Sequence, residues 1–101
     1  MRGRRRQRRN LQFNYSEYFY KPAGVPLRQL DETIVSDEEL EALRLQYLTK
    51  LEQRKAAKKM GISQSQFQRD VTKAIEKITR GLIEGHAISV RRYSSIAKES
   101  K

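Results

Sequence analysis

Four polar side chains near the middle of the chain have the types and the spacing to read DNA bases. They are Gln64, Ser65, Gln68 and Arg69, and their spacing places them on one face of a helix. Glutamine can form two hydrogen bonds with adenine and arginine two with guanine, while serine tolerates several bases. The pattern predicts direct base contacts in a major groove. It is also typical of the solvated face of an ordinary helical hairpin, and the pattern alone does not choose between the two.

Two short segments before these residues would hold them in place. Ala56, Ala57 and Met60 predict the small apolar face of a first helix, and Gly61 suits the left-handed conformation of a tight turn. Ser63 then supplies a side-chain oxygen that caps a second helix. The apolar residues of this second helix recur at helical spacing, at Phe67, Val71, Ala74, Ile75, Ile78 and Leu82.

Positive charge dominates the chain and concentrates around this helical pair. The formal net charge is +10, and residues 50–80 carry nine Lys or Arg against three acids. Such a surface favours nucleic acid, because cationic side chains release counterions from phosphates. We expect phosphate contacts from both helices, at Gln53, Lys55, Lys58, Lys59, Thr72 and Lys73, and from an N-terminal arm, at Arg4, Arg5 and Arg6. Double-stranded DNA is the partner that this arrangement predicts.

The arm, residues 1–10, and a polar tail, residues 91–101, are expected to lie outside the folded domain. Six arginines and no acid precede Asn10, a composition that repels itself and buries no core, so the arm is expected to be disordered when free. Arginine enters narrow minor grooves, which makes the arm a candidate for minor-groove contacts. Indiscriminate binding to polyanions fits the same composition.

The remaining segments predict a mainly α domain over residues 11–90. Ser36 and Glu39 form a capping box that begins a helix over about residues 37–48, and Thr49 with Glu52 is a second candidate box. The helix-turn-helix follows over about residues 51–82, with a recognition helix over about 64–80. The expected fold is a three-helix helix-turn-helix domain. A short β pair from the two terminal segments, 11–20 and 86–90, is left open.

Catalytic and metal chemistry find little support in the sequence. The chain has no cysteine and one histidine, His86, which no matching cluster of carboxylates accompanies. We therefore expect no metal, no cofactor and no enzymatic activity. No apolar run approaches the length of a membrane span, and no apolar segment follows the basic N-terminus as in a signal peptide. The expected location is the cytoplasm, in association with the nucleoid and without membrane contact.

Ordered motifs in the chain resemble a known family. They are K-P-A-G-V-P (residues 21–26), D-E-E-L-E-A-L-R-L (37–45), A-A-K-K-M-G-I-S (56–63) and G-L-I-E-G-H-A-I (81–88). Over roughly residues 19–90 they are similar to domain-of-unknown-function family 134, small prokaryotic predicted DNA-binding proteins. The resemblance implies a mostly helical domain whose helix-turn-helix is similar to region 4 of sigma-70 type factors, with its recognition helix in the major groove.

The chain departs from the pattern of that family at four positions. Gln64 stands where an arginine commonly follows the capping serine, and Gln66 where a threonine precedes the core phenylalanine. Asp70 occupies a position that is normally apolar, where an acid either shifts packing onto Val71 or places negative charge near DNA. Lys50 stands where a glycine commonly ends the preceding helix, at some conformational cost. Arg69 matches, and its role in base contact is the first that the resemblance carries over. These departures predict a different base preference on the same fold.

Sequence-specific binding of double-stranded DNA, with a role in transcription regulation, is the principal hypothesis. Half-site reading normally requires a homodimer, although no residue identifies its interface. An RNA-binding or ribosome-associated protein is one alternative, because of the arginine-rich arm and the aromatic-rich segment 11–20. A module that docks on RNA polymerase is another, and the acidic residues 38–41 are its only support.

Overall fold

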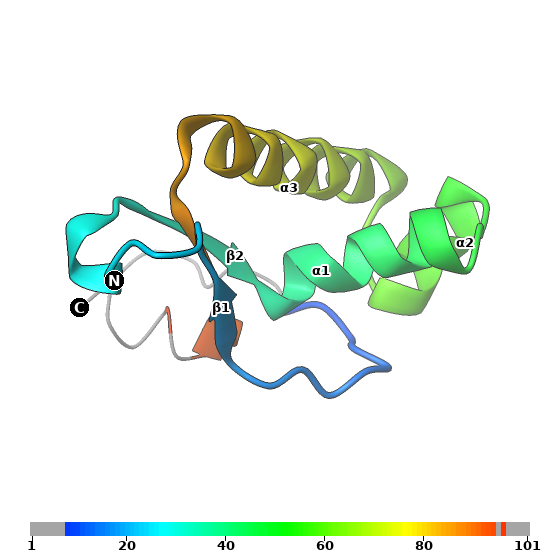
Figure 1. The fold of residues 1–101 in the computed structure, drawn as a ribbon. Coiled ribbons are helices and arrows are strands. Elements are labelled where there is room, and N and C mark those ends of the chain that lie inside the picture. The colour runs from blue at the N-terminus through cyan, green and yellow to red at the C-terminus, as the bar shows by residue number, and fades with distance from the viewer. Residues whose placement is uncertain (1–7, 95, 97–101) are drawn as a thin grey trace, which may run out of the picture.

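The computed structural model describes residues 8–94 and residue 96, and it shows a small sheet crossed by one long helix (Figure 1). The elements in chain order are β1 (Tyr18–Tyr20), the 3-10 helix η1 (Leu27–Gln29), β2 (Glu32–Ser36), α1 (Asp37–Leu43), the π-helix η2 (Arg44–Leu48), α2 (Gln53–Met60), α3 (Gln64–Glu84) and β3 (Ala87–Arg91). α3 packs against β2 and β3, and α1 and α2 pack against α3. The fold is mainly α with short strands, as the sequence predicts.

The sheet joins the two ends of the domain. Its order is β1-β3-β2, with β1 antiparallel and β2 parallel to β3. Pairing of the terminal segments is confirmed, since Tyr18 lies opposite Val90. The expected extent is wrong, because the first strand covers only Tyr18–Tyr20, and β2 was not predicted at all. Residues 11–17 leave the sheet because they run along α1, where Glu41 accepts hydrogen bonds from two of them.

The helix predicted over residues 37–48 is present but changes its winding. Ser36 and Glu39 form the expected capping box. After Leu43 the chain continues as the π-helix η2, in which hydrogen bonds span one more residue per turn. Lys50 then takes a left-handed φ of 61°. A glycine takes this conformation at lower cost, which agrees with the departure that the sequence shows at this position.

α2 and α3 form the expected pair of helices joined by a tight turn. α2 begins at Gln53, and the capping box predicted from Thr49 and Glu52 is wrong. The Thr49 hydroxyl donates instead to the Leu45 carbonyl at 2.6 Å. Gly61 closes α2 with a φ of 72°, as expected. The hydroxyl of Ser63 accepts a hydrogen bond from the amide three residues later at 3.1 Å, which confirms the cap of α3.

The hydrophobic core lies where α1, η2, α2 and the first half of α3 meet. Phe67, Leu45 and Met60 are fully buried there. The predicted apolar stripe of α3 is confirmed in this half but is wrong further on, because Leu82 is exposed. Gly81 is the residue that meets the sheet, and a Cβ at Gly81 would lie 2.9 Å from Cγ1 of Ile88. This close approach of α3 to β3 leaves Leu82 on the outer side.

The acids at the start of α1 are buried, and the expected acidic surface over residues 38–41 is wrong. Glu38, Glu39 and Glu41 lie under the surface. Glu39 accepts the Ser36 amide of the capping box and the ammonium of Lys77, each at 3.0 Å. The carboxylates at the start of α1 therefore do not form a negatively charged surface. None of the helices in the described part of the chain has the length and apolar character that a membrane crossing requires.

Candidate nucleic-acid interface

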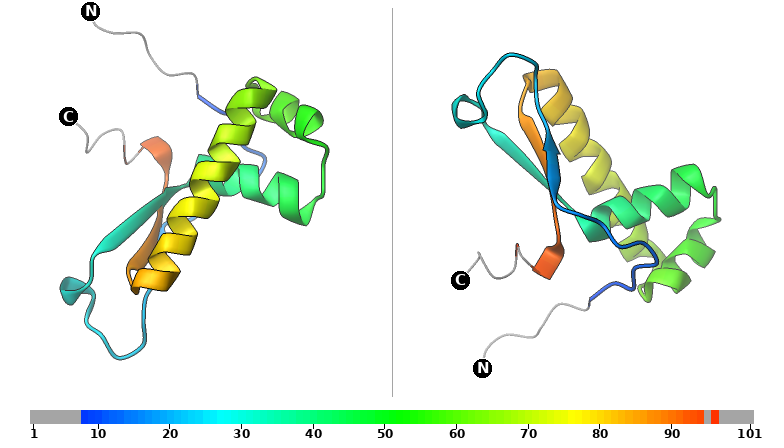
Figure 2. Two further views of the ribbon diagram at one scale, coloured as in Figure 1. Left: turned by 90° about the horizontal axis from the view of Figure 1, so that it is seen from above. Right: turned by 60° about the horizontal axis from the view of Figure 1, so that its bottom comes forward.

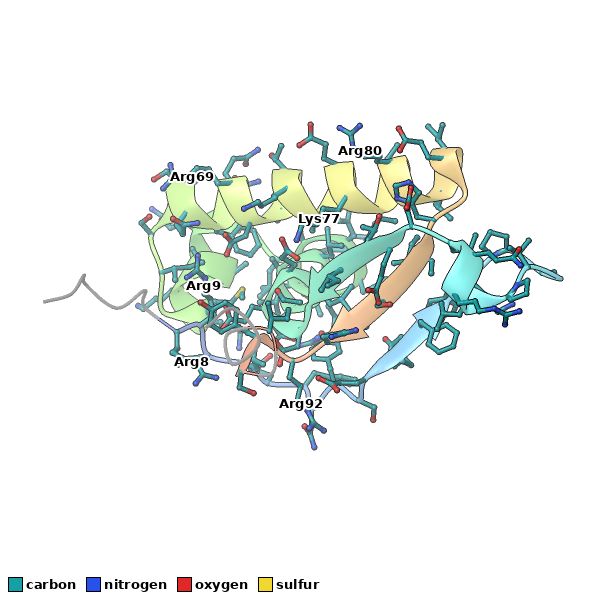
Figure 3. The ribbon with its side chains drawn as sticks, turned by 90° about the vertical axis from the view of Figure 1, so that its left-hand side faces the viewer. Arg8, Arg9, Arg69, Lys77, Arg80 and Arg92 are labelled. Atoms are coloured by element: carbon teal, nitrogen blue, oxygen red, sulfur yellow. The ribbon has the colours of Figure 1, made fainter. Side chains whose placement is uncertain are left out.

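The four candidate base-reading side chains lie together at the start of α3. Gln64, Ser65, Gln68 and Arg69 are all exposed on the first two turns of the helix, whose opposite face packs into the core through Phe67. Figure 2 shows α2 packed beside this end of α3. Arg69 points away from the body of the protein (Figure 3). The local structure therefore presents these residues as one outward-facing set.

A chain of hydrogen bonds connects Arg69 to the N-terminal arm. Nη2 of Arg69 donates to Oε1 of Gln66 at 3.0 Å, and Nε2 of Gln66 donates to Oδ1 of Asp70 at 2.8 Å. Asp70 in turn accepts two hydrogen bonds from the guanidinium of Arg9, at 3.1 and 3.2 Å. The sequence left open whether the acid at position 70 shifts core packing or approaches DNA. In the structure it binds the arm, and Val71 fills the core position beside it.

This ion pair fixes the point at which the arm leaves the domain. The side chains of Arg9 and Asp70 are only 7% and 13% exposed, and the Asn10 amide donates to the Met60 carbonyl at 2.9 Å. Residues 9 and 10 therefore lie against the helical pair, which differs from the freely disordered arm that the sequence predicts up to Asn10. Arg8 is exposed beside them (Figure 3). Arg4, Arg5 and Arg6 lie outside the described residues.

The phosphate-contact candidates on the two helices differ in their environment. Lys55, Lys58 and Lys59 are exposed on α2, and Thr72 and Lys73 are exposed on α3. Three of these five side chains thus lie on α2, and two lie on α3, the helix that carries the base-reading set.

Gln53 has a different role from the one predicted. It is half-buried, and its Nε2 donates to Oε1 of Gln46 at 3.0 Å, so its side chain braces α2 against η2.

A buried polar network that the sequence did not reveal clamps the segment after the arm onto α1. Glu41 is fully buried and accepts four hydrogen bonds. They come from the Gln12 amide at 3.0 Å, the Tyr15 hydroxyl at 2.9 Å, and Nε and Nη2 of Arg44 at 3.1 and 3.0 Å. The ring of Phe13 lies under the Arg44 guanidinium at 5.5 Å. The sequence held one signal that Glu41 is buried: it lies one turn before Leu45, on the buried face of its helix.

The pKa shifts in this network favour the protonation states that its hydrogen bonds require. Burial alone would raise the pKa of Glu41, but hydrogen bonds from Arg44, the Gln12 amide and Tyr15 hold that pKa below its ordinary value. Burial, followed by the hydrogen bond to Glu41, raises the pKa of Tyr15 well above its ordinary value. The hydrogen bonds to Glu41 raise the pKa of Arg44. At neutral pH the carboxylate is charged and its phenol partner is protonated, which is the state that the hydrogen bonds require.

His86 takes part in contacts between elements. Its Nδ1 lies 2.9 Å from the Thr33 hydroxyl, and its Nε2 lies 3.2 Å from Glu84 Oε1. Within the described residues, no three His, Cys, Asp or Glu side chains gather as a metal would require. The histidine thus joins the end of α3 to β2.

Comparisons with known proteins identify relatives of the chain. A family model described as "Protein of unknown function DUF134" matches residues 1–95. A UPF0251 protein of Halothermothrix orenii is 50% identical over 70 residues, which cover 69% of this chain and 52% of the relative. One of Desulforudis audaxviator is 44% identical over 88 residues, 87% of this chain and 58% of the relative. One of Vibrio parahaemolyticus is 45% identical over 73 residues, 72% of this chain and 76% of the relative.

The chain spans little more than half the length of the first two of these relatives. No solved structure matches it. The match to the family model nevertheless extends over nearly the whole sequence, through the arm, the helical pair and the closing strand. The chain therefore belongs to the DUF134 family of proteins of unknown function.

Proposed function

We propose that the chain is a sequence-specific double-stranded DNA-binding protein that regulates transcription. The observation that carries this proposal is the separation of charge. The acids of α1 are buried, whereas the exposed side chains of α2 and of the first half of α3 are polar or cationic. Such a surface attracts the phosphate backbone and places hydrogen-bonding groups where base edges lie in a major groove. A cytoplasmic, nucleoid-associated location follows from the same proposal.

In this proposal the first two turns of α3 enter the major groove. Arg69 is the main base-reading residue, because guanidinium pairs two-fold with guanine, and Gln64 and Gln68 suit adenine. The hydrogen bond from Arg69 to Gln66 restricts the guanidinium before DNA arrives, so less side-chain entropy is lost on binding. The exposed lysines of α2 and Lys73 contact phosphates on the flanks, which supplies affinity without sequence preference.

In vitro selection from a random duplex-DNA pool at near-physiological salt tests this function. The intact chain should enrich a motif. Arg69→Ala should relax the preference at about one position and cost roughly 1–3 kcal/mol on the selected site. Arg28→Ala is the matched control, because it removes the same charge from an exposed position in η1, at the opposite end of the molecule from the first turns of α3 (Figure 2). Absence of a motif, or equal losses for Arg69→Ala on selected and random duplexes, would refute base reading.

Binding of single-stranded RNA is a second candidate, and the exposed aromatic strand β1 favours it. Tyr18, Phe19 and Tyr20 are all exposed on this edge strand. Aromatic rings of this kind can stack on unpaired bases. If RNA is the ligand, single-stranded RNA should outcompete duplex DNA and Gln68→Ala should have little effect. The polymerase-docking alternative loses its support, since the acids on which it rested are buried.

A further inference from the structure

The second half of α3 carries apolar side chains that the domain itself does not cover. Leu82 and Ile83 are 70% and 78% exposed, and Ile75, two turns earlier, is exposed on the same side. Beside Ile75 lies a groove of about 610 Å³ between β1, α1, η2 and the middle of α3. Its walls include Phe13, Tyr18, Leu43, Leu48, Ile75 and Ile78. Leu48 is itself 78% exposed at the rim.

Large apolar side chains gather on this surface. Leu48, Leu82 and Ile83 are each at least 70% exposed, and a cluster of exposed apolar residues of this kind is typical of a protein interface. The surface is also continuous, because Ile75 and Thr79 line both the groove and the outer side of α3. It is therefore a candidate protein interface.

We propose that a second copy of this chain covers this surface, in a two-fold dimer with the two α3 helices antiparallel and centred on Thr79. In a two-fold contact the same patch serves both partners, so it must be complementary to itself. Antiparallel pairing about Thr79 brings Ile75 of one copy opposite Ile83 of the other. Leu82 of each copy then meets the rim of the other copy's groove. The patch thus supplies both the projecting side chains and the hollow that receives them.

The charges around the patch are complementary under the same symmetry. Glu76 comes within one helical turn of Arg80 of the second copy, and Arg80 of the first copy comes equally close to Glu76 of the second. Within one copy, Arg80 and Glu84 form only a long, exposed pair at 3.7 Å. Such a pair contributes little to stability and can exchange partners at small cost. The alternating signs therefore favour the antiparallel pairing over a parallel one, which would place equal charges side by side.

The spacing of the dimer matches DNA, a point that rests on the function proposed above. Phe67, in the middle of the base-reading segment, lies 12 residues before Thr79. With a rise of 1.5 Å per residue, the two segments of an antiparallel pair lie about 36 Å apart. Two half-sites one helical turn apart on DNA are separated by ~34–36 Å. Gln64 and Gln68 lie on the same side of α3 as Leu82 and Ile75, but the residues before Ala74 extend beyond the end of the second copy's α3, which is at Glu84. The two helices therefore do not cover each other's first turns.

Sedimentation equilibrium of the chain without DNA tests the dimer. The intact chain should show twice its monomer mass at micromolar concentrations. Leu82→Glu and Leu48→Glu should each weaken the dimer at least about tenfold. Both residues are mostly exposed, so circular dichroism should show an unchanged fold. Leu27→Glu, the same change on an exposed leucine in η1, is the matched control and should leave the dimer intact.

A charge exchange tests the antiparallel arrangement itself. Glu76→Arg alone should weaken the dimer by placing like charges together, and adding Arg80→Glu should restore it. A monomeric wild-type chain, or a dimer that neither glutamate substitution weakens, would overturn the proposal. A dimer in which the double exchange fails to restore affinity would overturn the antiparallel pairing. The sedimentation experiment contains no DNA, so it tests the dimer independently of the DNA function. If the chain is a monomer but still enriches a motif in the selection experiment, only the dimer is refuted. If the chain is a dimer but enriches no motif, only the DNA function is refuted.

Discussion

Removal of one hydroxyl from the Glu41 network should measurably destabilise the domain. Tyr15→Phe deletes the 2.9 Å hydrogen bond to a carboxylate that is 0% exposed and leaves three of its four donors. A hydrogen bond to a charged group contributes about 1.5–3 kcal/mol, and solvent does not replace the donor at a buried site. In a domain of this size the loss corresponds to a decrease in Tm of roughly 10 °C. The ring itself stays, so no cavity forms.

Thermal and urea unfolding at pH 7 would measure the change, with Tyr20→Phe as the control for an exposed phenol. Tyr15→Phe should lower the free energy of unfolding by much less in a protein that already carries Glu41→Gln, because the charged acceptor is then absent. Equal effects of Tyr15→Phe and Tyr20→Phe would refute the argument. Additive effects of Tyr15→Phe and Glu41→Gln would show that the two side chains act independently.

The same network predicts a pH dependence. The pKa of Glu41 is lower in the folded chain than its ordinary value, which describes the unfolded chain. Stability from this group is therefore fully present above the ordinary value of about 4.3 and is lost as the pH falls through the folded pKa. In Tyr15→Phe the carboxylate has one donor fewer and its folded pKa moves up toward the ordinary value, so the loss of stability in acid is smaller and is complete at a higher pH. Urea titrations between neutral and acidic pH would show it.

Two further predictions concern the arm and the turn before α2. Removal of residues 1–7 deletes four arginines and should weaken binding to all duplexes alike. It should also reduce the slope of log K against log salt by ~0.9 for each phosphate that these arginines neutralise. Fluorescence anisotropy measures this slope, and an unchanged slope would show that these arginines do not touch DNA. Lys50→Gly should stabilise the domain by about 1 kcal/mol, because glycine accepts the φ of 61° without strain; an unchanged or lower urea midpoint would contradict it, and Lys50→Ala, which keeps the Cβ, is the control.

The sequence alone was sufficient for the features that local chemistry dictates. The capping box at Ser36, the cap at Ser63 and the left-handed turn at Gly61 depend on residues within one helical turn, and the structure confirms all three. The cost at Lys50 was also visible locally. The buried half of the α3 stripe followed from helical spacing, since that half packs on neighbouring helices. The exposed, polar first turns of α3 followed from the same spacing.

Tertiary structure decided every feature that depends on which segments meet. β2 forms because residues 32–36 pair with β3. A five-residue segment has too short a pattern to predict this pairing. Asp70 became the anchor of the arm because Arg9, 61 positions away, lies beside it. Glu41 became buried because Gln12 and Tyr15 supply donors that its own helix lacks. Leu82 stayed exposed because Gly81 allows α3 to touch the sheet. Long-range packing of this kind satisfies buried charge and sets helix rotation, and no local spacing encodes it.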